Sequence, residues 1–243
     1  YWSAALAAGC TIVGRPSELT PMSAMALVSL MHEAGLPPGV INLVNGDPAS
    51  MGEVFLHSPL VGKLCFTGSQ RVGQMLMRGA ADSFRRLSLE LGGSAPTLVF
   101  ADADPETAAR QVVTGKFRNN GQTCISPARI YVQRPLYDAF IAAAKAETEK
   151  HIVGAGMEAG VTLGPLVTAA GRDKVELFVQ DALAKGAVAV TGAQRPPARE
   201  RGFFYEPTLL TNVNATMRIS CDEVFGPVMP ISPFDTLEEG IAL

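Results

Sequence analysis

One cysteine lies in a polar turn, at the end of a segment that reads Phe-Arg-Asn-Asn-Gly-Gln-Thr-Cys and spans Phe117 to Cys124. A predicted helix that opens at residues 104–106 precedes this turn, and a β-rich run over residues 128–133 follows it. A turn can expose a thiol to a cleft and can offer backbone N–H groups to an oxygen anion. The pattern therefore indicates a nucleophilic cysteine. The alternative is a small buried side chain, which is the commoner fate of cysteine.

A carboxylate and a pair of glycines mark a second position of interest. Glu90 falls within a predicted strand over residues 86–91, which Gly92 and Gly93 end. A thiol, a carboxylate and glycine-rich turns together suggest a covalent intermediate that water attacks in a second step. Taken alone, a carboxylate at a strand end is more often a solvated or capped group.

The composition and net charge of the chain argue against two classes of partner, nucleic acids and membranes. The chain has 243 residues, of which 47% are hydrophobic and 18% are charged, and its net charge is -3. Because this charge provides no basic surface, a nucleic-acid partner is not expected. The uncharged opening stretch, residues 1–14, is too short to span a bilayer and lacks the basic region of a secretion signal, so we expect no membrane association.

The cysteines and histidines are scattered. The four cysteines (positions 10, 65, 124 and 221) are never spaced as C-x-x-C, and the three histidines form no cluster. We therefore expect no disulfide framework, no metal site and a cytoplasmic location. The chain begins at Tyr1 and stops at Leu243 within helix-like sequence, which indicates a piece of a longer protein.

Strand–helix alternation predicts an α/β fold in two parts. In the first part, apolar strands are expected at residues 10–13, 40–44, 63–67 and 86–91, with helices between them. This alternation favours a parallel sheet covered on both faces, with ligands at the carboxyl ends of its strands. The second part begins with a strand at residues 95–100. We place the boundary at Gly92-Gly93, so that Glu90 and Cys124 would face a cleft between domains.

Four motifs, in this order, resemble those of the NAD(P)-dependent aldehyde dehydrogenase superfamily. They are Phe66-Thr67-Gly68-Ser69, Glu90-Leu91-Gly92-Gly93-Ser94-Ala95-Pro96, Phe117–Cys124 and Glu223-Val224-Phe225-Gly226-Pro227-Val228. The resemblance extends from end to end of the chain, and the Glu90 and Cys124 motifs are highly specific.

The resemblance implies a fold and a mechanism. Residues 1–92 would be the C-terminal part of a Rossmann-like NAD(P)-binding domain, and residues 93–243 an α/β catalytic domain truncated at its C-terminus. Cys124 would add to an aldehyde, with its own backbone N–H helping to hold the oxyanion. Glu90 would activate the water that hydrolyses the resulting thioester.

The resemblance also implies a set of cofactor contacts. These are Arg15, Pro16, Ser17 and Glu18 along the adenosine ribose, Gly68 and Ser69 near the pyrophosphate, Leu91 near the nicotinamide, and Glu223 with Phe225 at the nicotinamide ribose. For Phe225 the alternative is plain core packing. Glu18 favours NAD because a carboxylate repels a 2′-phosphate. Arg15 stands where the family usually has lysine, and a guanidinium could tolerate that phosphate, so NADP stays open.

Arg118 carries the expectation about substrate. The succinate-semialdehyde dehydrogenase branch resembles this chain here, and its arginine contacts the distal carboxylate of the substrate. The alternatives are a surface arginine paired with a neighbouring acid, or an enzyme for another aldehyde such as glutarate semialdehyde. Ser126 occupies the position where that branch often has a second cysteine. By the resemblance, the parent protein would be a dimer or tetramer, and this truncated chain could be inactive alone.

Overall fold

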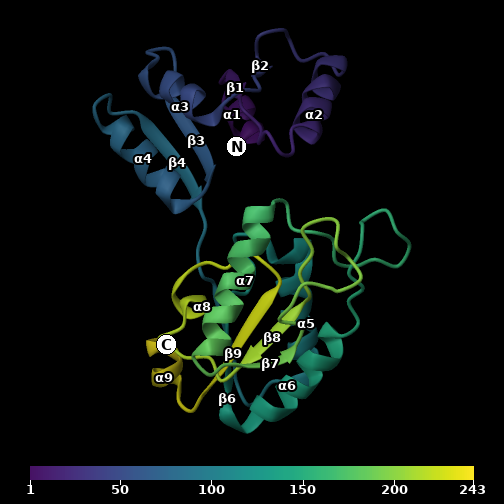
Figure 1. Ribbon diagram of the computed structural model, residues 1–243. Helices are drawn as coiled ribbons and strands as arrows, with labels where there is room; N and C mark the ends of the chain where they lie inside the picture. Colours follow the sequence, from purple (N-terminus) through teal and green to yellow (C-terminus); the bar gives the residue numbers. More distant parts are fainter. The chain divides into compact units, whose positions relative to one another are not determined.

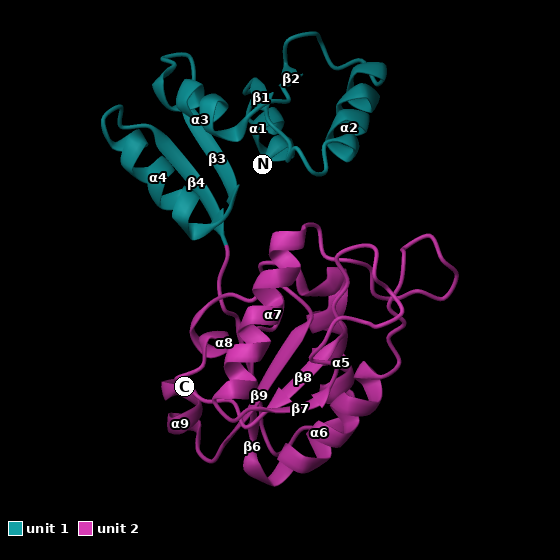
Figure 2. Cartoon of the chain, viewed as in Figure 1, with its two compact units in different colours: residues 1–91 teal, residues 92–243 magenta.

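The computed structural model describes residues 1–243, which divide into two compact units, residues 1–91 and residues 92–243 (Figures 1 and 2). Both units alternate strands with helices, as the sequence predicts. No helix in either unit has the length and apolar character that a membrane span requires.

Unit 1 is built from four helices and four strands. The helices are α1 (Trp2–Ala7), α2 (Met22–Glu33), α3 (Pro48–His57) and α4 (Gln70–Ala81), and the strands are β1 (Ile12–Gly14), β2 (Ile41–Leu43), β3 (Lys63–Gly68) and β4 (Arg86–Leu91). The strands form two separate parallel pairs, β1–β2 and β3–β4. The sequence predicted a single sheet here, and that expectation is wrong. Apolar alternation identifies strands and favours parallel pairing, but it does not determine which strands become neighbours.

The core of unit 1 lies between its later helices and the longer strand pair. Leu56 of α3 and Leu76 and Ala80 of α4 are its buried side chains. At the end of β4, the side chain of Leu91 packs on the backbone of α4, because a Cβ built on Gly73 would lie 2.6 Å from Leu91 Cδ2. Gly73 thereby allows α4 to approach the carboxyl end of β4.

Unit 2 contains a five-stranded sheet in the order β5-β6-β9-β8-β7. Its strands are β5 (Pro96–Val99), β6 (Arg129–Gln133), β7 (Val188–Thr191), β8 (Thr208–Thr211) and β9 (Val228–Phe234). The helices are α5 (Pro105–Phe117), the 3₁₀ helix η1 (Arg118–Gly121), α6 (Arg134–Thr148), α7 (Ala169–Ala184), α8 (Arg218–Cys221) and α9 (Leu237–Ala242). All pairs are parallel except β7–β8, which is antiparallel.

Helices cover both faces of this sheet. Leu209 packs in a cluster with residues of α5 and α6, whereas its neighbour Leu210 packs in a second cluster with residues of α7. Consecutive strand residues point to opposite faces, so α5 and α6 cover one face and α7 covers the other (Figure 1). The turn with Cys124 connects α5 to β6 and is therefore anchored at both ends in the core.

Candidate active site

Cys124 lies in an exposed turn between α5 and β6. The backbone N–H of Ser126 donates to the carbonyl of Thr123 at 3.1 Å, which closes the turn around the cysteine. No group of the protein accepts a hydrogen bond from the Cys124 N–H. The alternative of a buried structural cysteine is wrong for this residue. An exposed thiol next to an unpaired backbone donor has the arrangement that nucleophilic addition to a carbonyl needs.

Three consecutive residues with positive φ give this turn its shape. Asn119, Asn120 and Gly121 have φ angles of 50°, 60° and 70°. Asparagine and glycine are the residues that adopt this region at lowest cost, which explains the Asn-Asn-Gly sequence. Asn119 also closes the bend, because its carbonyl accepts from the Gln122 N–H at 3.1 Å. The chain can thus leave α5 and reverse sharply before Cys124.

Side-chain amides attach the turn to the loop that precedes α7. Asn120 is buried and donates through Nδ2 to the carbonyl of Gly164 at 2.9 Å. The Val167 N–H donates to Oε1 of Gln122 at 3.1 Å. These two bonds connect residues that are 44 and 45 positions apart in sequence, and they restrict the motion of the turn.

Gly121 forms a second attachment, to the loop that precedes β9. A Cβ built on Gly121 would overlap the backbone carbonyl of Gly226, and it would lie 3.3 Å from the carbonyl oxygen of Lys116. A Cβ on Gly226 would in turn overlap the Val175 side chain of α7. The Cys124 turn, the Gly226 loop and α7 therefore pack against each other without space for side chains at either glycine.

Ser126 anchors the far end of the turn. Its hydroxyl is buried and donates to the carbonyl of Lys116, in the last turn of α5, at 3.2 Å. That carbonyl is one of the acceptors that a helix end leaves without an intrahelical partner. Ser126, which stands in place of a second cysteine, thus has a structural role: it fixes the turn to α5.

Glu223 lies in the loop that contains Gly226. Its Oε1 accepts from the Gly93 N–H at 3.3 Å, and its carboxylate occupies the space that a Cβ at Gly92 would need. The ammonium of Lys174, in α7, donates to the Glu223 backbone carbonyl at 2.6 Å. The glutamate is therefore held through both its side chain and its backbone.

Phe225 follows in the same loop with φ of 54°, a costly conformation for an aromatic residue. The residue is 42% exposed, so the alternative of core packing is wrong. An exposed ring on a strained backbone indicates a binding role more readily than a structural one.

Arg118 caps α5 at its carboxyl end and is exposed. Its guanidinium forms neither an ion pair nor a hydrogen bond in the structure. The alternative, a surface arginine paired with a neighbouring acid, is therefore not what the structure contains. The cation remains available for an anionic ligand.

The predicted adenosine-side residues lie in unit 1, directly after β1. Arg15 forms an ion pair with Glu18, and its Nη2 also lies 3.4 Å from the carbonyl oxygen of Gly46. A backbone N–H and the Arg15 guanidinium hold the pKa of the Glu18 carboxyl below its usual range. Hydrogen bonds from Ser50 lower the pKa of the Asp47 carboxyl, and the charge of Arg15 adds a smaller effect in the same direction. Pro16 and Ser17 lie between Arg15 and Glu18 and form a turn after β1. In this turn the Ser17 carbonyl accepts from the Thr20 N–H at 3.1 Å.

The predicted pyrophosphate residues stand at the start of α4. Ser69 caps this helix through Oγ, which accepts from the Val72 N–H at 3.4 Å. Gly68 ends β3, and a Cβ there would lie 2.5 Å from Cζ of Phe66. Helix N-termini present unpaired N–H groups to anions, and a glycine at the preceding position keeps the backbone accessible. Glu90 is exposed on β4, next to Leu91.

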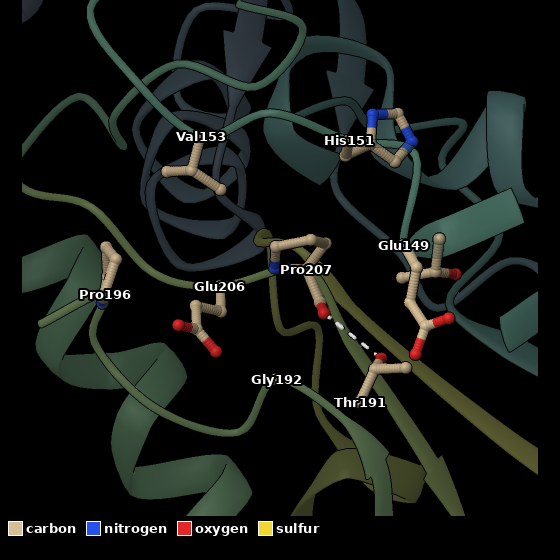
Figure 3. A pocket seen from close by; sticks show the side chains of 9 residues that line it. Glu149, His151, Val153, Thr191, Gly192, Pro196, Glu206 and Pro207 are labelled. Atoms are coloured by element: carbon tan, nitrogen blue, oxygen red, sulfur yellow. Dashed lines mark hydrogen bonds between the residues drawn. The ribbon is translucent and has the colours of Figure 1, made fainter. Parts of the chain in front are cut away.

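A separate concavity of about 320 Å³ lies elsewhere in unit 2 (Figure 3). Glu149 and Glu206 contribute carboxylates to it, and burial lowers the pKa of the His151 imidazole at its edge. Its lining includes no cysteine and none of the predicted site residues; it consists of Thr148, Glu149, His151, Val153, Thr191, Gly192, Pro196, Glu206 and Pro207. We therefore assign the candidate active site to the Cys124 turn and not to this concavity.

Two lysines near the site were not predicted from the sequence. Lys174 contacts the Glu223 backbone, and Lys116 is buried beneath the Cys124 turn with 1% of its surface exposed. The only sequence signal was the position of Lys116 within an apolar helical stretch, where a lysine is unusual. Lys174 has no such signal, because its position on α7 resembles that of any surface lysine.

Comparison with known proteins adds relatives of known activity. The chain is 46% identical over 239 residues to the mitochondrial succinate-semialdehyde dehydrogenase of Arabidopsis thaliana, covering 98% of this chain and 45% of that protein. It is also 46% identical to the glutarate-semialdehyde dehydrogenase of Pseudomonas aeruginosa, covering 98% of this chain and 49% of that protein.

A solved structure has the same fold. The betaine aldehyde dehydrogenase of Staphylococcus aureus, in complex with NAD⁺, superimposes with a TM-score of 0.93 at 38% identity, covering 99% of this chain and 48% of that one. The chain thus spans about half the length of the relatives that it matches. Residues 1–243 match the model of the aldehyde dehydrogenase family, and the chain belongs to that family.

Proposed function

We propose that this chain carries the thiol, the general base and part of the cofactor site of an enzyme that oxidises succinate semialdehyde to the dicarboxylic acid. The observation that carries the proposal is the exposed Cys124 beside its own unpaired N–H, in a turn fixed by Gly121 and Ser126. Units 1 and 2 would be the partial NAD(P)-binding domain and the catalytic domain, and Glu90 would be the general base.

The chemistry follows from the two reactive groups. The Cys124 thiolate forms a bond to the aldehyde carbon, and the Cys124 N–H stabilises the negative charge on the oxygen. Loss of hydride leaves a thioester on Cys124. Glu90 then takes a proton from water, whose oxygen attacks the thioester carbon, and the thiolate leaves. One aldehyde and one water thus yield one carboxylic acid, with two electrons removed.

NAD, when bound, would accept the hydride. The fit of unit 1 to a dinucleotide rests on the α4 N-terminus with Gly68 and Ser69 before it, and on the buried Arg15 Nε, which lacks a partner within the protein. In unit 2, Glu223 would accept hydrogen bonds from the nicotinamide ribose, next to the exposed Phe225 ring. Glu18 pairs with Arg15, which favours NAD over NADP because a 2′-phosphate would meet the Glu18 carboxylate.

The unpaired guanidinium of Arg118 supports an acidic substrate. A bidentate, charge-assisted contact to the distal carboxylate would orient the aldehyde toward Cys124. Glutarate semialdehyde, which is longer by one methylene, is the second candidate, supported by the 46% identity to the Pseudomonas glutarate-semialdehyde dehydrogenase. The free state of all four cysteines supports a reducing compartment such as the cytoplasm, and the parent protein would be a homo-oligomer.

The experiment that tests the proposal is NADH formation by the chain with succinate semialdehyde, beside Cys124→Ala and a matched Cys221→Ala control. Cys221 is an exposed cysteine outside the site, so its loss should leave turnover unchanged. Turnover that is lost only in Cys124→Ala supports the proposal, and equal turnover in both variants contradicts the role of Cys124. If the chain itself is silent, a thermal shift on adding millimolar NAD distinguishes a formed cofactor site from a non-catalytic fragment.

A further inference from the structure

Asn120 is a buried amide in the middle of the turn that carries Cys124. Only 4% of its surface is exposed, and its φ angle is 60°. Its Nδ2 donates to the carbonyl of Gly164 at 2.9 Å, across 44 positions of the chain. The amide therefore connects the turn to a segment that is remote in sequence.

Only one half of this amide is used. Oδ1 of Asn120 is buried and has no hydrogen-bond partner in the protein. A buried acceptor without a partner costs free energy, so stability alone does not explain an amide at this position. The opposite orientation of the amide would place Oδ1 against the Gly164 carbonyl oxygen and leave the donor without a use. The contribution of the side chain is therefore the donor that Gly164 accepts.

The Gly164 carbonyl is a fixed acceptor. Leu163, directly before it, is 1% exposed and packs with residues of α5 and α6. Leu166, two residues after it, packs with residues of α7 on the other face of the sheet, and its N–H donates to the Phe203 carbonyl at 2.9 Å. Two buried leucines in two close-packed clusters leave the backbone between them little freedom. An amide that binds Gly164 thus holds the turn against the core of unit 2.

The bond acts on the stretch that ends at the thiol. Cys124 follows Asn120 by four residues. Between them, Gln122 binds the same loop, because its Oε1 accepts from the Val167 N–H at 3.1 Å. Addition to a carbonyl requires that the sulfur and the oxyanion donor be oriented together, and a misplacement of about 1 Å costs up to about 10²-fold in rate. Loss of the Asn120 bond would release this stretch from one of its two attachments to the loop.

We propose that Asn120 is a positioning residue for Cys124, whose buried amide holds the turn so that the thiol and the Cys124 N–H are oriented together for addition to an aldehyde. The nucleophilic role of Cys124 belongs to the proposed function, on which this inference rests, whereas the attachment of the turn by Asn120 does not depend on it. In the addition, the sulfur forms a bond to the aldehyde carbon, the π electron pair moves to the oxygen, and the thiol proton ends on that oxygen. This step needs no cofactor, so the orientation of the thiol is measurable without hydride transfer.

Asn212 provides a matched control. It also has a positive φ, of 55°, and its Nδ2 donates to the carbonyl of a glycine, Gly186, at 2.6 Å. Asn212 follows β8, whereas the Cys124 turn precedes β6, and β6, β9 and β8 run parallel, so the two asparagines lie at opposite edges of the sheet. Glycine adopts positive φ freely, so Asn120→Gly and Asn212→Gly each keep the backbone conformation and lose one amide bond.

The attachment is tested by hydrogen exchange of backbone amides, followed by NMR. In Asn120→Gly we expect the Val167 N–H to exchange about ten-fold faster than in the wild-type chain, because one buried hydrogen bond in place of two then holds the loop to the turn. In Asn212→Gly the Val167 rate should not change, because this amide opens locally and not through unfolding of the whole unit. Equal rates in the wild type and Asn120→Gly, or equal acceleration in the two variants, overturn the attachment.

The positioning role is tested by protection of Cys124 from alkylation. Iodoacetamide labelling, measured at each cysteine by mass spectrometry of peptides, slows where succinate semialdehyde holds the thiol as its adduct. We expect the aldehyde to protect Cys124 in the wild-type chain, with a dissociation constant about ten-fold higher in Asn120→Gly and unchanged in Asn212→Gly. Without aldehyde, labelling of this exposed thiol should differ by less than about two-fold among the three chains, which separates orientation from access.

The outcomes distinguish the inference from the proposed function. If the aldehyde protects Cys124 equally in the wild type and Asn120→Gly, the positioning role is wrong and the proposed nucleophile stands. If labelling without aldehyde changes as much as the dissociation constant, Asn120 controls access to the thiol and the positioning role is wrong. If the aldehyde does not protect Cys124 even in the wild type, the proposed nucleophile and the positioning role are both wrong, and the Val167 exchange rate alone decides the attachment.

Discussion

Gly121 packs directly against the backbone carbonyl of Gly226, although the two residues are 105 positions apart in the chain. This contact joins the turn that carries Cys124 to the loop that carries Glu223. At Gly121, with φ of 70°, the backbone conformation and the lack of space both require glycine.

We therefore expect Gly121→Ala to destabilise unit 2 by about 3 kcal/mol or more, because the new methyl group overlaps backbone that cannot rotate away. Gly115→Ala is the matched control. That glycine lies within α5, and its Cβ would meet Pro127 at an ordinary 3.6 Å. Its replacement should stabilise the chain by about 0.5–1 kcal/mol through helix propensity. Urea denaturation measures both, and similar losses in the two variants would contradict the packing described here.

The buried Lys116 makes the stability of the folded chain depend on pH. Its pKa is about 8 in the folded chain and 10.5 in the reference state, so between these values the unfolded chain binds more protons and wild-type stability rises with pH. Lys116→Met should be more stable than wild type by about 2 kcal/mol near neutral pH. The difference should shrink as the pH rises from 8 to 10.5. Urea denaturation of Lys116→Met and of the wild-type chain at both ends of that pH range measures the difference in stability. A difference that stays constant with pH would contradict the prediction.

Glu18 is expected to govern the choice of cofactor. Glu18→Gln removes the carboxylate that pairs with Arg15 and frees the guanidinium for a 2′-phosphate. The affinity for NADP should then rise about ten-fold relative to that for NAD, as a change of roughly 1.4 kcal/mol would produce. Calorimetric titration with each dinucleotide measures the ratio. Glu33→Gln, at the end of α2, is the control, because it changes the net charge by the same amount. If both variants had the same ratio of NADP affinity to NAD affinity, the effect would not be local to Glu18.

Glu90 is expected to act only after the thioester forms. Glu90→Gln should therefore leave the first turnover nearly intact and slow the following ones about 10²–10⁴-fold, because glutamine cannot accept the proton of the attacking water. Rapid mixing should give a burst of one NADH per Cys124, and mass spectrometry of the intact chain should find the acyl group on that cysteine. A first turnover that is slowed as much as the later ones would remove the general-base assignment.

Arg118 is expected to select acidic aldehydes. Arg118→Ala should raise KM for succinate semialdehyde by about ten-fold or more and spare an uncharged aldehyde of similar length, since only the former loses a charge-assisted contact. Arg110→Ala removes an exposed arginine from α5, the helix that precedes Arg118, and should leave both substrates unaffected. Equal losses for the charged and uncharged aldehydes would contradict the substrate argument.

Much of the local structure could be predicted from the sequence. The helix before Cys124 starts at Pro105 after the Asp104 cap, and β4 ends at Leu91, because caps, prolines and apolar periodicity act over a few residues. The Asn-Asn-Gly run predicts a turn, and the structure contains three left-handed residues there. Cys124 could be proposed as a nucleophile from the sequence because a thiol, a turn and a following strand are adjacent in the chain.

Only the tertiary structure decided which distant groups meet. The sequence could not predict that β1–β2 and β3–β4 form separate pairs, because apolar alternation does not encode strand neighbours. Nor could it place Lys174 at the Glu223 carbonyl, since that hydrogen bond joins residues 49 positions apart. Local rules determine where helices, strands and turns occur, whereas burial and charge pairing depend on the packing of the whole unit.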